Sequence, residues 1–469
     1  MTEILVLGAG LNGLTTAMLL AEDGHRVTVL ERDDAPPPPR TVLPHWDRPG
    51  VSQFQGAHFM QPRWHAEMRT VLPEVLDELV SAGGRPTNTL DLVFPAARCE
   101  RRPDDGRFDT IAARRPVLES AVAAVAARTP QVTIRRGVRA TGLVVVGRRV
   151  VGVRADSGGR TFKVMADLVV DCTGRRSPLP SWLADDDLGK PEEERADAGF
   201  VYYGRHFHGA LPSSEVPLTH RHNSISILTV PCDNGTWAVV FAVSSRDTAL
   251  RALRDVGPWN ALLARYPAAA HWADGDPITA VDVMGGLNDR SRRYVVDGRP
   301  VATGVVALGD AAYFTNPALG RGASMGILHA QVLRDVIRET GFDDPEKLVL
   351  QFDERGSAVV DPWYRNTTWM NEHRLAEIDA DIAGRLYQPA DPRWDLARSL
   401  YADGLLDPDS ARVYLTAAAM LEAGPGDEAV LRRVLSKGTG GPRYPLPGPD
   451  RAELLAVLDL AAGQAGNEI

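Results

Sequence analysis

The sequence predicts an α/β fold in which a parallel-sheet domain is interrupted by a β-rich insert and followed by a helical region. Three observations predict it. An apolar run, a glycine-rich turn and a helical pattern follow one another at residues 3–21, and the same order recurs at residues 301–337. Runs of β-type residues lie between these segments, and the pattern after Gly341 is helical. With 469 residues, 44% of them hydrophobic, the chain can bury a large core and divide into two or three domains.

The first segment predicts a buried strand that runs into a phosphate-binding turn. Ile4–Leu7 is apolar without the alternation of a half-exposed strand, as expected in a parallel sheet covered on both faces. Gly8 permits a tight turn, Gly10 lets the backbone approach a pyrophosphate, and Gly13 lets helix and strand pack closely. The N-terminus of the following helix offers free N–H groups to the phosphates.

A second strand is predicted over His25–Leu30, and Glu31 follows it directly. At this distance from the glycines, a carboxylate meets the ribose hydroxyls of an adenosine. Strand, glycines, helix, strand and terminal acid together indicate a Rossmann-like dinucleotide-binding unit. The alternative is a glycine turn in some other α/β unit.

The later segment predicts the other end of the same ligand site. Val301–Leu308 reads as a buried strand with Asp310 just beyond its C-terminal end, where open α/β sheets bind their ligands. Asp310 could bond a ribityl hydroxyl, and Pro317, Gly320 and Gly322 would let backbone lie against a flat ring. The two segments together suggest one flavin held from two ends, with the positive end of a helix at the ring.

Composition and spacing argue against several other classes of protein. The net charge of −9 disfavours nucleic acid or an anionic membrane as the main partner. Cys99, Cys172 and Cys232 are too far apart in sequence to suggest a disulfide framework or a redox dithiol. We find no metal-ligand spacing, and interpret Glu372–Arg374 as a solvated helix face. Neither a signal peptide nor a membrane-spanning run is evident, so we expect a soluble cytoplasmic protein.

Three stretches together carry a resemblance to a known family. They are GAGLNG with Glu31, the strand end DCTGRRS at Asp171–Ser177, and GDAAYFTNPALGRGAS at Gly309–Ser324. This set resembles the FAD-dependent monooxygenases of the para-hydroxybenzoate hydroxylase-type fold, including their epoxidase relatives. Further matching pieces are Arg40, Gln55–His58, Arg115 with Glu119, Tyr202–Arg205 and Pro447–Arg451. Without the resemblance, Asp171–Ser177 could simply end a parallel sheet.

The resemblance implies noncovalent FAD and assigns residues to its parts. The glycines Gly8, Gly10 and Gly13 would touch the pyrophosphate, and Glu31 the adenosine ribose. The remaining assignments are Arg40 and Arg115 to the phosphate and ribityl region, Asp310 to the ribityl chain, and Pro317, Gly320 and Gly322 to the ring. Arg40 and Arg115 could instead be surface arginines.

The resemblance also implies the chemistry. Reduced FAD reacts with O2 to a flavin C4a-(hydro)peroxide, which transfers one oxygen atom to a small apolar, aromatic or alkene substrate by hydroxylation or epoxidation. The protein then needs no nucleophile of its own. It has to stabilise the reduced ring, exclude water and orient the substrate.

The resemblance divides the chain into four segments. Residues 1–182 and 290–340 would form the FAD-binding domain, residues 183–289 a β-rich substrate domain, and residues 341–469 a C-terminal helical region. The β signals of the insert are clearest at Ser224–Val230 and Trp237–Val243. Helical patterns of the last segment cover Leu348–Val360, His373–Leu386, Ser410–Ala423 and Glu428–Leu435.

Candidates for substrate contact lie mainly in the predicted insert. Tyr203, Trp237 and Phe241 could line an apolar pocket, although each is more often plain core, because aromatic residues dominate any sheet interior. His58 and Arg205 are the polar candidates for a catalytic role.

One departure bears on how the flavin is reduced. Aromatic hydroxylases of this fold usually carry an Asp-Gly pair where this chain has Thr173-Gly174. Electrons could therefore come from NAD(P)H directly or from a partner flavin reductase. Other readings are a reductase of the same superfamily, such as a prenyl reductase, and a binding protein without FAD. A halogenase is disfavoured, because the first lysine is Lys163 and no WxWxIP motif occurs.

Overall fold

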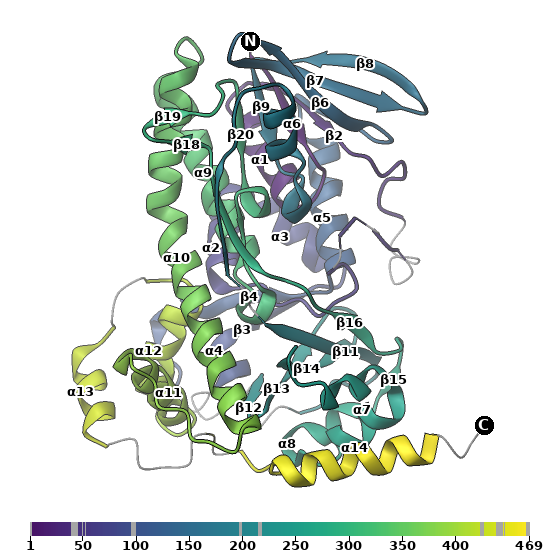
Figure 1. Ribbon diagram of the computed structural model, residues 1–469, viewed down its shortest axis with the longest axis vertical. Helices are drawn as coiled ribbons and strands as arrows, with labels where there is room; N and C mark the ends of the chain where they lie inside the picture. The colour runs from purple at the N-terminus through teal and green to yellow at the C-terminus, as the bar shows by residue number, and fades with distance from the viewer. Residues whose placement is uncertain are drawn as a thin grey trace.

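A computed structural model describes residues 2–38, 46–48, 50–51, 53–94, 100–196, 199–213, 218–422, 426–437, 444 and 446–465. The chain forms two halves (Figure 1). The upper half in this view holds the N-terminus and a parallel sheet, and the lower half holds an antiparallel sheet and helix α14, Arg451–Ala465. Helix α10, Pro345–Ile382, runs along both halves.

Five parallel strands form the central sheet of the upper half, in the order β20, β9, β1, β2 and β5. Their bounds are Val305–Ala307 for β20, Leu168–Asp171 for β9, Glu3–Leu7 for β1, Arg26–Leu30 for β2 and Val132–Arg135 for β5. This is the sheet that the two apolar runs and the strand before Asp171 predict, so the α/β fold class is confirmed.

Both faces of this sheet are covered, which explains why the first strand shows no alternation. Ile4 and Val6 pack into a core with one set of helices, and Leu5 and Leu7 pack into a second core on the opposite face. The first set is α1 Leu11–Glu22, α2 Pro62–Val71, α3 Pro73–Ser81, α5 Arg115–Arg128 and α9 Gly322–Thr340. The opposite face is covered by β6 Arg139–Val146, β7 Arg149–Ser157, β8 Arg160–Met165, α6 Leu179–Asp185 and part of α10.

The lower half is built on an antiparallel sheet whose two faces have different partners. Its strands are β11 Phe200–His208, β12 Thr219–Arg221, β13 Ile225–Pro231, β14 Thr236–Ser244, β15 Asp276–Pro277 and β16 Asp282–Met284. One face packs on α7 Val256–Leu263, a 3-10 helix at Ala249–Arg254 and α14. The other face packs toward α10 and the loops of the upper half. The two predicted β runs are β13 and β14.

Short elements complete the two halves and the region between them. They are β3 Arg85–Asn88, β4 Asp109–Ala112, α4 Thr89–Val93, β10 Glu192–Ala196, β17 Asp289–Arg293, β21 Tyr313–Phe314, β18 Val295–Val296, β19 Arg299–Pro300 and α8 Pro267–Ala270. Strands β10, β17 and β21 pair antiparallel, and β21 belongs to the predicted flavin segment after Asp310. That segment is therefore held by strand pairing as well as by packing.

The C-terminal region is helical as predicted, but its helices differ from the sequence pattern. The predicted helix Leu348–Val360 lies within the single helix α10, which continues through Pro362 and ends at Ile382, inside the predicted helix His373–Leu386. The others are α11 Pro392–Gly404, α12 Pro408–Ala418 and α13 Glu428–Ser436. The interpretation of Glu372–Arg374 as a solvated face is wrong for Arg374. Arg374 is buried, because it reaches the backbone carbonyls of His222 and Ile225 in the antiparallel sheet.

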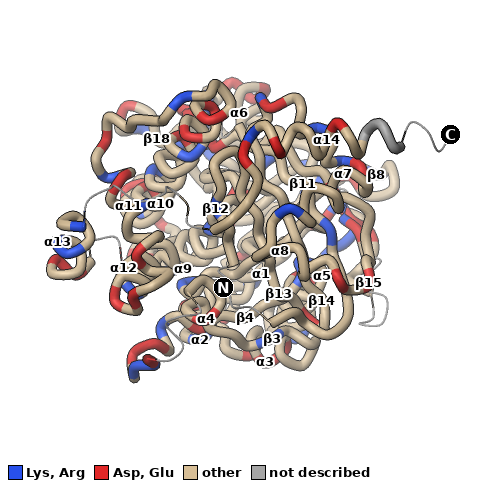
Figure 2. Tube along the Cα trace, turned by 90° about the horizontal axis from the view of Figure 1, so that it is seen from below, with Lys and Arg blue, Asp and Glu red and all other residues tan. Residues whose placement is uncertain are grey.

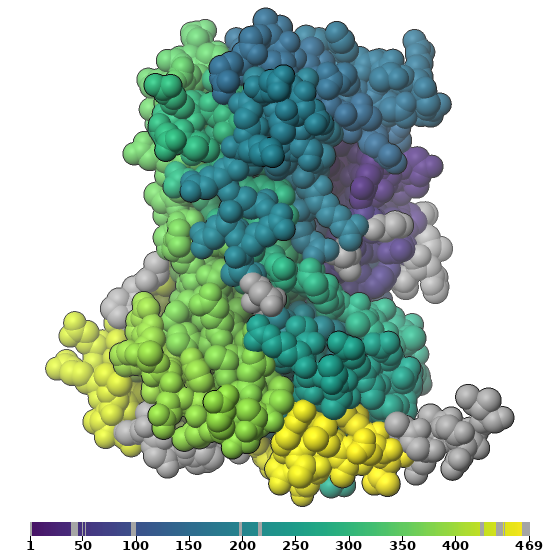
Figure 3. All heavy atoms as spheres, viewed as in Figure 1, coloured from purple at the N-terminus to yellow at the C-terminus, as the bar shows by residue number. Residues whose placement is uncertain are grey.

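A buried ion pair ties these helices to the N-terminal part of the chain. Arg412 of α12 donates to both carboxylate oxygens of Asp105, at 2.8 and 2.7 Å. Both side chains are almost completely buried. Figure 3 shows the resulting surface, with the green residues of α10 running from the upper to the lower half and yellow α14 at the lower edge.

Charges on the described chain are interspersed. Figure 2 shows basic and acidic residues mixed along the trace, without a large region of one sign. Among the helices that the structure describes, none has the length and apolar character needed to cross a lipid bilayer.

Candidate cofactor and substrate site

A cavity of about 640 Å³ lies at the carboxyl ends of the parallel strands. Its wall includes Leu7, Leu30 and Leu308, each at or next to the end of a strand of the parallel sheet. Glu31 and Asp310 both line this one cavity. The two sequence segments therefore meet around a continuous space.

The glycines of the first turn are required by close backbone approach. Gly8 has φ +97°, and a Cβ there would lie 2.8 Å from the carbonyl oxygen of Cys172. A Cβ on Gly13 would lie 2.0 Å from the carbonyl oxygen of Gly8. Gly10 differs, because its φ is −85° and a Cβ would meet no protein atom within 4 Å. Gly10 lines the open cavity, so the absence of a side chain there leaves space next to the backbone for a ligand.

Asn12 joins the two predicted flavin segments physically. It is the second residue of α1, and its side chain lies against Gly309 and Gly326. A Cβ on Gly309 would lie 2.4 Å from Asn12 Nδ2, and one on Gly326 would lie 2.2 Å from Asn12 Oδ1. Helices α1 and α9 pack together here. The glycine loop and the Asp310 turn are thus held side by side.

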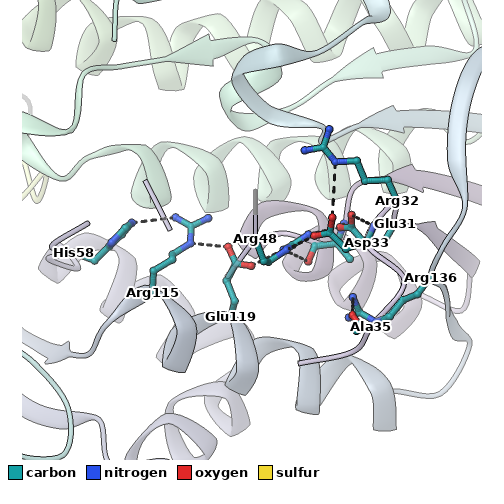
Figure 4. A network of polar contacts seen from close by, with 10 residues as sticks. Glu31, Arg32, Asp33, Ala35, Arg48, His58, Arg115, Glu119 and Arg136 are labelled. Atoms are coloured by element: carbon teal, nitrogen blue, oxygen red, sulfur yellow. Dashed lines mark hydrogen bonds and ion pairs between the residues drawn. The ribbon is translucent and has the colours of Figure 1, made fainter. Parts of the chain in front are cut away.

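A buried network surrounds Glu31 (Figure 4). The carboxylate of Glu31 accepts a hydrogen bond from Ala9 N at 2.8 Å and one from Arg48 Nη2 at 2.6 Å. Arg48 also contacts Asp33 at 2.7 Å and Glu119 at 2.5 Å. Glu31, Arg48 and Glu119 are buried, so one guanidinium bridges several carboxylates in and beside the wall of this cavity.

Arg48 is charged over the whole accessible pH range. Burial by itself lowers the pKa of the Arg48 guanidinium, but Glu119 and Glu31 outweigh burial, so this pKa lies above its ordinary value. The sequence did not indicate Arg48, because it follows a proline-rich stretch with no periodic pattern. The predicted residue Arg40 lies outside the described residues.

Arg115 lines the same cavity as Glu31 and Asp310. Its Nε donates to Glu119 at 2.7 Å, and its Nη1 lies 3.4 Å from His58 Nε2. His58 Nδ1 lies 2.9 Å from the carbonyl oxygen of Gly56. Because a carbonyl only accepts, Nδ1 carries the proton and Nε2 turns its lone pair to Arg115.

His58 is neutral at physiological pH. Burial, and next to it the charge of Arg115, lower the pKa of the His58 imidazole to about 3. The imidazole therefore serves as a neutral acceptor that orients Arg115. This position does not support the catalytic role that the sequence suggested for His58.

Asp310 lies at the other end of the cavity, in a 3-10 helix at Gly309–Ala311. Burial raises the pKa of the Asp310 carboxyl, and the charges of Arg115, Arg175 and Arg290 oppose that rise. The carboxylate sits 3.6 Å from where a Cβ on Gly322 would lie. Asp310 and the start of α9 therefore face the same space.

The loop Pro317–Gly320 is fixed by polar contacts on its buried side. Asn316 accepts hydrogen bonds from Ala318 N, at 3.0 Å, and from the hydroxyl of Tyr202, and its own N–H donates to Asp289. Asp289 in turn accepts from Asn371 of α10 at 2.9 Å. The loop thus has a defined shape.

Gly320 needs its glycine for the same reason as Gly8. Its φ is +61°, and a Cβ would lie 2.9 Å from the carbonyl oxygen of Phe59. Gln61 Nε2 also donates to the carbonyl oxygen of Leu319 at 2.6 Å. The loop is therefore pressed closely against residues 59–61.

A second cavity of about 230 Å³ adjoins the first. Asn12, Arg115 and Asp310 line both, so the two spaces are neighbours. Most of its wall is apolar. The wall includes Ala57, Phe59, Met60, Val93, Leu218, Leu228, Val230, Met284, Leu287, Phe314, Pro317, Ala318, Leu319, Tyr401, Tyr414 and Leu415.

The predicted substrate contacts Tyr203, Trp237 and Phe241 need correction. All three pack in the core on the opposite face of the antiparallel sheet, with Trp259, and none lines the second cavity. Side chains alternate along a strand, so neighbours of these residues, such as Tyr202, turn to the other face. The plain-core alternative is the one that fits.

Arg205 also faces away from the second cavity. Its Nη1 donates to Asn260 Oδ1 at 2.8 Å, and its guanidinium lies over Phe207 and Trp259. This placement does not support the catalytic role that the sequence suggested for Arg205. The residues that do line the cavity come from β12 and β13, from loops and from helices α4, α9, α11 and α12, so no single periodic pattern marks them in the sequence.

Thr173 lies in the wall of the first cavity, and its polar groups bond to Asp171, the last residue of strand β9. Its hydroxyl donates to Asp171 Oδ1 at 2.6 Å, and its N–H donates to the same oxygen at 2.9 Å. The Thr173 side chain brings no negative charge to the cavity.

Comparisons with known proteins agree with this geometry. A family model described as FAD dependent oxidoreductase matches residues 3–38. Protein Rv3254 from Mycobacterium tuberculosis (strain ATCC 25618 / H37Rv) is 30% identical over 417 residues, covering 83% of this chain and 84% of the relative.

Solved structures show the same fold at low sequence identity. The p-nitrophenol 4-monooxygenase PnpA from Pseudomonas putida DLL-E4 has a TM-score of 0.61 at 16% identity, covering 94% of this chain and 98% of that one. A triple mutant of the flavin-dependent brominase Bmp2 has a TM-score of 0.60 at 12% identity, covering 93% and 99%.

The matched N-terminal segment and the fold define a flavin-dependent oxidoreductase with the architecture of the FAD-dependent monooxygenases, which confirms the resemblance seen in the sequence. Within this class, the chain belongs to the same family as Protein Rv3254, with which it aligns over most of its length.

Arg48 provides the first prediction. In Arg48→Met, Glu31 and Glu119 lose a buried cationic partner, so we expect the free energy of unfolding to fall by about 3 kcal/mol or more. We also expect FAD retention to fall, because the carboxylate of Glu31 loses a contact that orients it. Urea denaturation and the flavin-to-protein absorbance ratio measure the two effects.

The control is Arg128→Met, which removes a largely exposed arginine that contacts Glu78 at 3.1 Å. It should cost less than about 1 kcal/mol. Equal losses in the two variants would contradict the importance of the Arg48 network.

Proposed function

We propose that the protein binds FAD noncovalently along the first cavity and uses it to insert one oxygen atom from O2 into a small substrate in the second. The observation that carries this proposal is the contact of Asn12 with Gly309 and Gly326, because it brings the dinucleotide turn and the Asp310 segment to one cavity. In this proposal Glu31 receives the adenosine ribose, and Asp310 the ribityl chain.

The remaining cofactor residues follow from the same arrangement. Gly8, Gly10 and Gly13 leave room for the pyrophosphate at the start of α1. Arg115 reaches the middle of the cavity, held in place by Glu119 and His58. The backbone of Pro317, Gly320 and Gly322 would lie against the ring, since these residues line the second cavity next to Asp310.

Bound FAD, once reduced, supplies two electrons to O2, so that one oxygen atom enters the substrate and the other leaves as water. The protein's own part is to prepare the surroundings. The N-terminus of α9 directs positive potential toward negative charge on the ring. The apolar wall of the second cavity excludes water and confines the substrate next to Asp310.

Gly10 tests cofactor binding without disturbing the fold. Gly10→Val adds a side chain where the structure has no protein atom within 4 Å, so we expect a small loss of stability at most. The same side chain would occupy the place proposed for the pyrophosphate. We expect the affinity for FAD to fall at least about tenfold, or ~1.4 kcal/mol, measured by titrating the apoprotein with FAD.

Gly257→Val is the matched control. A Cβ on Gly257 also meets no atom within 4 Å, but it lies on α7, on the outer side of the antiparallel sheet. This variant should bind FAD like the wild type. If Gly10→Val also keeps its FAD affinity, the proposed cofactor site is wrong.

Oxygen transfer is tested with ¹⁸O2. Mass spectrometry of the products of a panel of aromatic and alkene compounds should find one ¹⁸O atom in a product, and none from H2¹⁸O. Saturation of a double bond without ¹⁸O would favour a reductase of the same superfamily. Incorporation of halide would favour a halogenase, although neither cavity has a lysine among its lining residues.

The electron source is a further part of the proposal. We expect NAD(P)H alone to reduce the flavin slowly, and a partner flavin reductase or bound substrate to accelerate the reaction. The supporting observation is that Thr173 stands where aromatic hydroxylases carry an aspartate, and its hydroxyl is bound to Asp171. Anaerobic rapid mixing with NADPH measures this step, and fast bleaching without any partner would contradict the expectation.

A further inference from the structure

Arg221 is a buried cation in the wall of the second cavity. It ends β12, where it pairs with Ser226 of β13, and its side chain is 9% exposed. Thr219, two residues earlier, and its strand partner Leu228 line the same cavity. Arg221 therefore belongs to the cavity face of the antiparallel sheet, whereas His220 between them turns to the other face.

Among the residues that the structure describes, no carboxylate is in direct contact with Arg221. Its Nη2 lies 2.9 Å from the hydroxyl of Tyr414, and its Cζ lies 4.8 Å from the ring centre of Tyr401. Within the described ranges it forms no ion pair and no other hydrogen bond. A phenol and an aromatic face orient a guanidinium, but they do not neutralise it.

The nearby carboxylate of Glu377 already forms ion pairs with two other arginines. Glu377 of α10 accepts from Arg374 at 2.9 Å through one oxygen and from Arg398 at 3.0 Å through the other. The hydroxyl of Tyr444 donates to Glu377 as well. Both oxygens of Glu377 are taken by these partners, so Glu377 acts on Arg221 only at a distance, without a direct contact, and its charge is shared with two other guanidiniums.

The other charged side chains that line the second cavity, Arg115 and Asp310, also line the first cavity. Arg115 is paired with Glu119, and Asp310 lies at the boundary with the first cavity. An unpaired charge in an apolar wall is costly, so such a residue is retained most readily where a ligand supplies the counterion. Arg221 fits this description.

We propose that Arg221 binds an anionic oxygen of the substrate, a carboxylate or an ionised phenol or enol. The proposal rests on the proposed function, in which the second cavity holds the substrate, and it narrows the substrate to planar apolar acids. A guanidinium held by Tyr414 and Tyr401 presents a flat, rigid fork, which matches two oxygens of an acid better than a single neutral group.

This contact also orients the substrate. The anionic end would lie against β12 and helices α11 and α12, and the apolar remainder would extend toward Pro317–Gly320 and Asp310 across the same cavity. The carbon presented to the flavin would then be one remote from the acidic group. Arg221 would thus determine both which substrates bind and where they react.

The test is calorimetric titration of the purified holoenzyme with three acid and amide pairs: benzoate, cinnamate and 2-naphthoate, each against its neutral amide. In the wild type we expect at least one acid to bind about tenfold or more tightly than its amide. Arg221→Met should abolish this preference, and Arg221→Lys should retain part of it. Arg251→Met, an exposed arginine on the outer side of the same sheet, should leave the preference unchanged.

Two outcomes overturn the proposal: no acid of the panel is preferred over its amide in the wild type, or the preference survives in Arg221→Met. Should Arg221→Met fail to fold, Arg221→Gln gives the same comparison with a polar side chain of similar length. The titration measures binding without turnover, so its outcome is separate from the ¹⁸O2 experiment. An acid preference without oxygen transfer would reject the proposed function alone, and oxygen transfer without an acid preference would reject the role of Arg221 alone.

Discussion

The site depends on the close approach of helix α1 to the Asp310 turn and helix α9. Asn12 fills the space between them, and that space exists because Gly309 and Gly326 have no side chains. Well-packed cores do not accommodate an added methyl group at 2.2–2.4 Å from another side chain without moving backbone. The spacing between the glycine turn at the start of α1 and the Asp310 turn is therefore set by packing between elements almost three hundred residues apart in sequence.

Sequence patterns predicted the parts of the site whose chemistry requires glycine or a strand end. Gly8 and Gly13 are required by backbone approaches of 2.8 and 2.0 Å, and requirements of this kind recur as a spacing that can be recognised. Arg48 could not be found in this way, because its role comes from three acids that converge only in the folded chain. The division into domains, and the individual cofactor contacts, stay predictions that the experiments above address.

The lining of the second cavity was predicted less well, for a physical reason. Alternation along β11 and β14 separates two sets of residues, but it does not say which set faces the cavity. Both faces of this sheet are buried, one under α7 and α14 and the other toward α10 and the loops of the upper half, so aromatic residues suit either face. Tyr203, Trp237 and Phe241 were chosen for size, and size does not distinguish the face against helices from the face against a ligand.

Arg48 and Arg221 show how charge balance can separate a structural arginine from a ligand-binding one. Arg48 is buried beside the first cavity with Glu31, Asp33 and Glu119 around it, so the folded chain itself compensates its charge. Arg221 is also buried, but within the described part of the chain its guanidinium contacts Tyr414 and Tyr401 and no carboxylate. If the chain had kept Arg221 for stability alone, an apolar side chain of similar volume would serve as well or better. We therefore expect the molecule that occupies the cavity to carry the negative charge that contacts Arg221.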